Sequence, residues 1–207
     1  MPTRVMIPPD PILTPADVPG SHAGDDPTIA GMIAAATRTI DGPSGWVGRS
    51  FGPQTLELTV TCWDELELLP YGPVIDIDAI TYATTDGVEQ ELDGAYWTLN
   101  GDLVSFGSSW SRPALAARRY PIKVQYQAGY DGNDPFSGGT GDIPEEAKAA
   151  IIAAVQQLML ARSDGLGVRS VEVQDIETIT YLDADKVSTI IKNATACYLS
   201  GLWVPVL

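Results

Sequence analysis

Neighbouring carboxylates are the first side chains of this sequence that could carry out chemistry. Asp76 and Asp78 lie two residues apart, and two carboxyl groups can divide the roles of acid and base in a hydrolysis. They alternate, however, with Val74, Ile77 and Ile80, which is typical of the exposed face of a half-buried strand. The strand is the favoured interpretation, because catalysis would also need a cleft that the sequence does not reveal. A carboxylate-dependent hydrolase remains the less favoured alternative.

A second acidic group surrounds a glycine-rich loop at residues 129–141, for which we expect mobility. Asp131, Asn133, Asp134 and Asp142 are residue types that can bind calcium, but the spacing of an EF-hand and its terminal bidentate glutamate are missing. The single histidine, His22, lies in a Pro-Gly-Ser-His-Ala-Gly segment, and no GxSxG motif accompanies it. We therefore expect no catalytic residues, no metal site, no cofactor and no enzymatic activity.

The net charge argues against a protein that grips nucleic acid. The 207 residues include 27 Asp and Glu against 12 Lys and Arg, which gives a formal charge of -15. A broad surface that binds phosphates needs the opposite sign. The hydrophobic fraction of 44% is sufficient for a real core, so the chain is expected to be globular.

Four of the few cations are concentrated in a dozen residues, and we call them the basic patch: Arg112, Arg118, Arg119 and Lys123. A solvated surface is the first explanation of this patch. The alternative is an inter-subunit contact, in which the patch faces acidic residues of a neighbouring copy, because opposed charges set the orientation between subunits.

The apolar C-terminal residues are the best candidates for docking: Leu202, Trp203, Val204, Val206 and Leu207. Gly201 ends the preceding helix and Pro205 prevents it from continuing, so residues 200–207 are expected to form an extended tail. Such a tail can insert between subunits or add to the sheet edge of a neighbour with Trp203 as its anchor, or it can fold back on its own core.

The two cysteines, Cys62 and Cys197, are interpreted as buried thiols, which fits a reducing compartment. Four prolines interrupt residues 1–13, so we expect an extended N-terminal arm without a signal peptide. The C-terminal apolar stretch is too short for a membrane helix, and no membrane contact is expected. These features indicate synthesis in the cytoplasm.

Helical periodicity flanks a β region, which predicts an α+β fold. The longest helix is expected at residues 142–162, with Ala147, Ile151, Ala154, Val155 and Leu158 on its buried face. A second helix opens at Asp26-Pro27, a third spans residues 184–199, and a short one starts near residue 14. Residues 14–49 and 142–199 together are interpreted as a helical bundle of three main helices and one short N-terminal helix.

Residues 50–129 change to a period of two and are interpreted as an all-β insertion into the helical core. Strands are expected near residues 54–63, 74–82, 96–100, 103–106 and 122–127. The Asn100-Gly101 pair predicts a hairpin between the third and fourth of them. One or two further short strands are expected between Val171 and Tyr181.

The order of these parts resembles a known family of proteins. The resemblance rests on the helix DDPTIAGMIAAATRTID, the phrase WVGRSFGPQTLEL, Pro73-Val74-Ile75-Asp76-Ile77 with the following ITY strand and Asp86-Gly87 turn, VQYQAGY, and IPEEAKAAIIAAVQQLMLAR. This arrangement, over residues 14 to 182, is similar to the head-to-tail connector, or adaptor, proteins of long-tailed phages and related gene transfer particles. The chain departs from the family in having few charges on its second helix and a longer C-terminal region.

The resemblance implies a structural virion protein at the head-to-tail interface, made in the bacterial cytoplasm. Members of the family form a ring of twelve copies under the portal, line the channel through which DNA passes, and provide a platform for a stopper or tail protein. The expected partners are therefore the portal protein, stopper or tail proteins, and copies of the chain itself. DNA would pass during ejection without specific binding. A stopper or tail-completion protein of a phage-like particle is the alternative.

Overall fold

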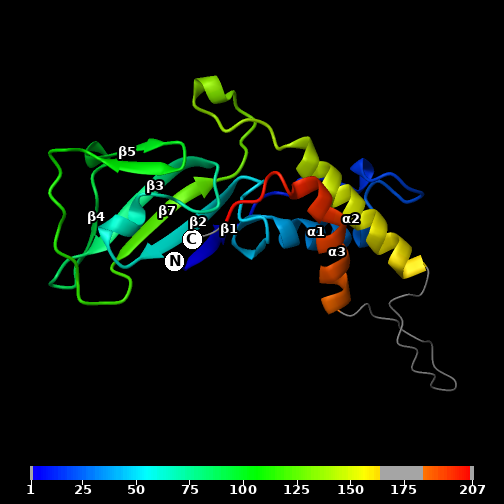
Figure 1. Cartoon of the computed structure of the whole chain (residues 1–207), viewed down its shortest axis with the longest axis horizontal. Coiled ribbons are helices and arrows are strands. Elements are labelled where there is room, and N and C mark those ends of the chain that lie inside the picture. Colours follow the sequence, from blue (N-terminus) through cyan, green and yellow to red (C-terminus); the bar gives the residue numbers. More distant parts are fainter. Residues whose placement is uncertain (1, 164–183, 206–207) are drawn as a thin grey trace, which may run out of the picture. The chain divides into compact units, whose positions relative to one another are not determined.

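The computed structural model describes residues 2–163 and 184–205, and these residues divide into two compact units (Figure 1). The β unit contains residues up to Asp10, Asp41–Ile143 and the residues from Trp203 onward. The helical unit contains Pro11–Ile40 and Pro144–Leu202. The chain therefore passes between the units after Asp10, Ile40, Ile143 and Leu202.

The β unit is built on an antiparallel sheet with strand order β1-β2-β7-β3-β4. Its strands are β1 (Thr3–Ile7), β2 (Gln54–Val60), β3 (Val74–Ala83), β4 (Glu89–Glu91) and β7 (Ile122–Ala128). A separate hairpin joins β5 (Trp97–Asn100) to β6 (Leu103–Phe106), as predicted. Its two-residue turn is Gly101-Asp102, because Asn100 still pairs with Leu103, and Gly101 has a φ of 60°. All five predicted strands are present. Together with the helices, they confirm the α+β fold class.

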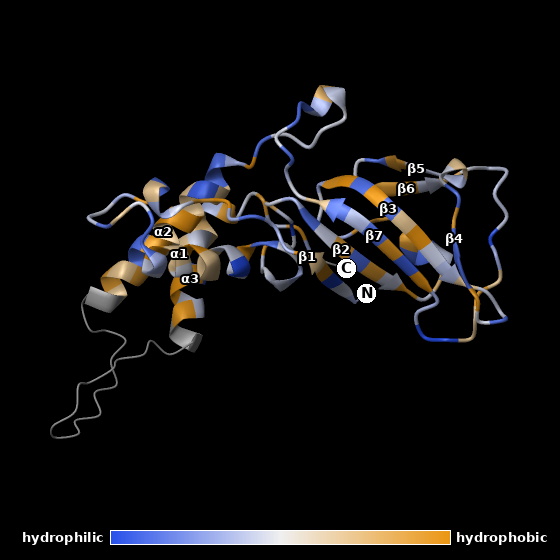
Figure 2. Ribbon diagram, turned by 180° about the vertical axis from the view of Figure 1, so that it is seen from behind, coloured by the Kyte–Doolittle hydropathy of each residue, from blue (hydrophilic) through white to orange (hydrophobic). Residues whose placement is uncertain are grey.

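The sheet follows from the alternation of apolar and polar residues along its central strands. Leu56, Leu58 and Val60 of β2 are fully buried, as are Val124 and Tyr126 of β7. Figure 2 shows the resulting alternation of hydrophobic and hydrophilic residues along β3 and β7. The central strands β2, β3 and β7 each contribute one face to a single core, which the hairpin residues Leu99 and Phe106 extend.

An aromatic cluster closes one region of this core. The ring of Trp63 meets Tyr82, Phe106 and Trp110 edge-on, with centroid distances of 5.4, 6.1 and 5.0 Å. Phe106 and Trp110 stack at 4.2 Å. The indole of Trp63 also donates a hydrogen bond to the carbonyl of Pro113 over 3.1 Å, so its polar edge is satisfied in the core.

The helical unit consists of α1 (Pro27–Ile40), α2 (Glu145–Ser163) and α3 (Ala184–Leu199), which pack against one another, and the 3-10 turn η1 (Pro15–Asp17). Asp26 starts α1 as predicted, because its Oδ1 accepts hydrogen bonds from the N–H groups of Thr28 and Ile29 at 2.8 and 3.4 Å. The predicted face of α2 is confirmed by its fully buried residues: Ala147, Ile151, Ala154 and Val155, with Leu158 at 2% exposure. Within residues 2–163 and 184–205, no helix is both long and apolar enough to cross a membrane.

The two cysteines are less buried than the sequence predicts. Cys62 and Cys197 are free thiols, but Cys197 is exposed on α3 and Cys62 is half-buried, so the prediction of two buried thiols is wrong. The strands expected between Val171 and Tyr181 lie outside the described residues.

Candidate docking surface

The C-terminal tail lies along the β unit and leaves its large aromatic side chain in solvent. After α3 ends at Leu199, the backbone N–H of Val204 donates a hydrogen bond to the carbonyl of Val47 over 2.9 Å. Trp203 is 54% exposed and Val204 is 37% exposed. The tail is thus attached through its backbone, while the indole is free to contact another molecule. Val206 and Leu207 lie outside the described residues.

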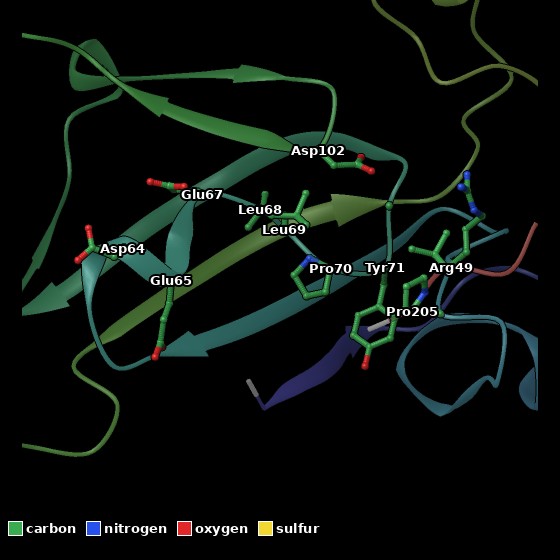
Figure 3. Close-up of a pocket in the computed structure, with 13 residues that line it drawn as sticks. Arg49, Asp64, Glu65, Glu67, Leu68, Leu69, Pro70, Tyr71, Asp102 and Pro205 are labelled. Carbon is green, nitrogen blue, oxygen red and sulfur yellow. The ribbon is translucent and has the colours of Figure 1, made fainter. Parts of the chain in front are cut away.

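The tail forms one wall of a groove in the β unit, with a volume of about 210 Å³. Its apolar lining consists of Leu68, Leu69, Pro70, Tyr71, Val204 and Pro205, and Figure 3 shows most of these side chains. Its charged lining consists of four carboxylates and one guanidinium: Asp64, Glu65, Glu67, Asp102 and Arg49. Leu68 is 45% exposed. The groove therefore offers an apolar surface with an acidic rim.

The floor of the groove is held by close contacts with Asp102. A Cβ atom on Gly72 would collide with the carboxylate of Asp102, so a larger residue there would require this side chain to move. The same carboxylate accepts a hydrogen bond from the N–H of Val74 over 2.8 Å, and the carbonyl of Asp102 accepts one from Leu69. Tyr71 has a φ of 62°, an unusual value for a residue with a side chain. These contacts give the groove a preformed shape.

The basic patch is already largely occupied by ion pairs within the chain. Arg118 and Lys123 both reach Oε1 of Glu89, at 3.0 and 2.9 Å, and Arg112 pairs with Asp64. Arg119 is exposed and its guanidinium lies 5.2 Å from the ring centre of Tyr120. Among the described residues, Arg119 is the member of the patch that has no carboxylate partner. The sequence could not show this division, because Glu89 and Asp64 are far from the patch along the chain.

Asp76 and Asp78 lie on the exposed side of β3, as the alternation predicts. Oδ1 of Asp76 accepts a hydrogen bond from the N–H of Ile77 over 2.8 Å. The carboxylate of Asp78 accepts from the amide of Gln127 over 2.8 Å and is 3.5 Å from that of Gln125. Both carboxylates thus accept hydrogen bonds on the exposed face of the sheet.

The glycine-rich loop folds around Asp131. The carboxylate of Asp131 accepts hydrogen bonds from the backbone and side chain of both Asn133 and Thr140, at 2.8 to 3.0 Å. Partial desolvation opposes ionisation of Asp131, but these hydrogen bonds outweigh it and lower its pKa. Sequence inspection missed this role and the complete exposure of Phe136 at the loop's 3-10 turn.

Neither the loop nor His22 forms a metal centre in the structure. The described parts of the chain contain no group of three or more His, Cys, Asp or Glu side chains that could hold a metal ion. His22 instead has local backbone contacts, with its Nε2 2.9 Å from the carbonyl oxygen of Val18 and its Nδ1 3.1 Å from that of Ala23. The histidine thus stabilises the turn that contains it.

Comparison with solved structures identifies the fold. A chain in the neck of an empty GTA particle, described with C6 symmetry, matches 100% of this chain and 98% of its own length, with a TM-score of 0.58 and 14% sequence identity. The chain has the fold of a protein in the neck of a gene transfer agent (GTA) particle. No family model matches the sequence, and no curated protein matches it.

Two further matches to GTA particles have lower scores. A chain in the neck of a native GTA particle, described with C12 symmetry, is 16% identical with a TM-score of 0.46 and covers 86% of this chain and 81% of its own. A chain in the virion of the native GTA particle is 15% identical with a TM-score of 0.49, and covers 100% and 98%. The fold of a GTA neck protein accounts for both the β unit and the helical unit, because the first match spans the whole chain.

Proposed function

We propose that the chain is a structural protein of a phage-like virion that forms a ring between the portal and the tail. The observation that carries this proposal is the whole-chain similarity to a protein in the neck of a GTA particle. The proposed ring has twelve copies, a number compatible with the C6 symmetry described for that neck. Its copies would line the DNA channel and offer a platform to stopper or tail proteins.

The charge of the chain suits a channel through which DNA moves. With a formal charge of -15, the subunit as a whole repels phosphates. A basic channel would release counterions from DNA and hold it tightly. We infer that DNA passes through the ring without specific binding. Binding of duplex DNA by the free subunit at 150 mM salt, measured as a gel shift, would contradict this inference.

The position and copy number of the subunit in assembled particles provide the direct test. Cryo-electron microscopy of particles carrying a tagged subunit should place the tag in a ring directly below the portal. A ring separated from the portal by another protein would instead indicate a stopper or tail-completion protein. An enzyme would be indicated if Asp76→Ala or Asp78→Ala abolished a turnover while particles still assembled.

The tail is proposed to dock on the portal or on a neighbouring copy. Trp203 is half-exposed next to a preformed groove, although Val204 already bonds to Val47. Buried tryptophans contribute strongly at protein interfaces, often by about 2 kcal/mol or more, or about 30-fold in affinity. Docking would therefore cover the exposed part of the indole.

Removal of residues 202–207 should leave the melting temperature within a few degrees but prevent the joining of heads and tails. The reason for the small thermal effect is that Trp203 and Val204 are exposed and contribute little to the core. Trp203→Ala should weaken docking to purified portal or ring by about 30-fold. Tyr96→Ala, which also truncates a 43% exposed aromatic residue, is the matched control and should not affect docking. A much lower melting temperature, or normal particle yield, would contradict docking in trans.

Arg119 is proposed as the residue of the basic patch that contacts a neighbouring copy, because the other three cations are paired with Glu89 and Asp64. Arg119→Glu should reduce ring assembly, measured by sedimentation in the presence of portal, with an effect that shrinks at high salt. Arg38→Glu changes the charge of an exposed arginine on α1 by the same amount and serves as the control. Equal effects of the two variants would indicate a response to net charge alone.

A further inference from the structure

The edge strand β1 is attached to the sheet without contributing to its core. Its residues Arg4, Val5, Met6 and Ile7 are all exposed, and Thr3 is half-buried. The strand is held by backbone pairing with β2, by an ion pair between Arg4 and Glu57 at 2.9 Å, and by hydrogen bonds from Thr59 to the carbonyl of Pro2 at 3.1 and 3.2 Å. Its removal would leave the buried residues of β2 in place.

The backbone of β2 needs a paired strand on this edge, even though its side chains remain buried without β1. Leu56, Leu58 and Val60 are fully buried, and the opposite edge of β2 is paired with β7. Without β1, the backbone donors and acceptors on the free edge of β2 would form a template for another strand. The structure shows which sequence fits this template, namely Thr3–Ile7 in antiparallel register with Leu58 to Thr55.

The segment after β1 allows copies to exchange this strand at a low cost in free energy. Pro8, Pro9 and Pro11 keep this segment extended, and Asp10 is the last residue of the β unit before the chain enters the helical unit. Because both copies have identical sequences, β1 of one copy can form all of its contacts with β2 of another copy. Only the path of the chain around Asp10 and Pro11 would change, which is the condition for exchange of an identical element.

The exposed apolar side chains of β1 favour a neighbouring copy as the source of the strand that pairs with β2. Val5, Met6 and Ile7 are 39%, 44% and 60% exposed, which places three consecutive apolar residues at a sheet edge. The opposite edge strand β4 is Glu-Gln-Glu and is protected by its charges. If β1 comes from another copy, the chain of that copy continues after Ile7. The rest of that copy then lies next to the apolar edge.

We propose that in the assembled ring β1 of each copy pairs with β2 of the adjacent copy, so that the subunits are linked by exchanged strands. This inference rests on the proposed ring function. In the unassembled subunit, β1 pairs with β2 of its own chain. Assembly replaces this pairing with the same contacts between chains, and the ring gains a backbone connection at every subunit boundary.

A mixed cross-linking experiment tests the exchange. One set of copies carries Arg4→Cys and a tag that increases its size, and the other carries Glu57→Cys, both with Cys62→Ser and Cys197→Ser. Residues directly opposite on antiparallel strands have Cβ atoms about 4.5–5.5 Å apart, close enough for a disulfide after a small adjustment. After co-expression, purification of particles and oxidation, we expect a disulfide-linked pair of one tagged and one untagged chain on a non-reducing gel. The unassembled fraction should not contain it.

Two controls define the result. The double variant Arg4→Cys with Glu57→Cys in one chain should close an intrachain disulfide in the free subunit, which verifies that the two sulfur atoms can meet. A mixture of Thr98→Cys and Ser105→Cys copies should give no mixed pair, because these residues face each other within the β5–β6 hairpin. Neck rings that contain both sets of copies without a mixed pair would overturn the exchange and leave the proposed function intact. Absence of the subunit from a neck ring would overturn both.

Discussion

Gly129→Ala should lower the free energy of unfolding by about 4 kcal/mol or more, a loss that only backbone collisions and comparable defects produce. Gly129 follows β7 and has a φ of 125°, which favours glycine. An added Cβ would lie 2.3 Å from the carbonyl oxygen of Gly52 and 2.8 Å from the nitrogen of Pro53. These atoms belong to the backbone and cannot rotate away, so the end of the sheet must separate.

Gly87→Ala is the matched control for this substitution. Gly87 also has a positive φ, of 80°, but an added Cβ would meet no atom within 4 Å. Its cost is therefore the left-handed backbone conformation alone, about 1–2 kcal/mol. Urea unfolding followed by tryptophan fluorescence should separate the two variants clearly. Similar losses of stability would show that backbone conformation, and not the approach of Gly52, determines the effect at Gly129.

Asp41→Asn should change the pH dependence of stability by about 3 kcal/mol. Burial raises the pKa of Asp41 from 3.8 to about 6, although hydrogen bonds from the N–H groups of Phe51 and Gly52 and the amide of Gln54 partly oppose the shift. The distances to Asp41 Oδ1 are 2.7 Å from Phe51 and 3.1 Å from Gln54. A difference of about two pKa units corresponds to about 3 kcal/mol at 1.36 kcal/mol per unit.

The direction of the effect follows from proton linkage. Because the folded pKa lies above the unfolded value, protonated Asp41 stabilises the fold fully below about pH 4, and this contribution is lost as the pH rises through about 6. Asparagine does not titrate, so the variant should gain about 2.5 kcal/mol relative to the natural chain between pH 4 and pH 7.5. Denaturant titrations at both values measure the difference.

Glu89→Gln provides a control of opposite sign. Hydrogen bonds from Lys123 and then Arg118 lower the pKa of Glu89, so its contribution is present above the unfolded pKa and is lost as the pH falls. Relative to the natural chain, this variant should therefore lose stability at pH 7.5 compared with pH 4. If Asp41→Asn also lost stability at pH 7.5 compared with pH 4, the result would contradict the burial of an ionised carboxylate at Asp41.

Regular periodicity made most of the fold predictable from the sequence. The buried face of α2 repeats at helical spacing, and β2, β3 and β7 alternate because one side of each faces the core. The hairpin was predictable from Asn100-Gly101, although the two turn residues are Gly101 and Asp102, and Gly101 supplies the positive φ. These signals are local, and each arises within a few consecutive residues.

The features that escaped prediction depend on partners far away in the sequence. β1 has apolar residues on both sides and four nearby prolines, and it becomes a strand because β2, about 50 residues later, accepts it. Asp41 has the sequence context of a helix terminus, yet its carboxylate is buried and accepts hydrogen bonds from Phe51 and Gln54. The tail's attachment to Val47 likewise joins segments that no periodicity connects.

The separation of β1 from β2 also affects the order of events during synthesis. Thr3 leaves the ribosome 55 residues before Leu58, its partner in the ladder. At about 5–20 residues per second, the first strand waits for several seconds before its own partner exists. During this interval, the complementary edge is found only in copies whose synthesis is further advanced. The pairing of β1 with β2 within one chain therefore forms late, after residue 58 has left the ribosome.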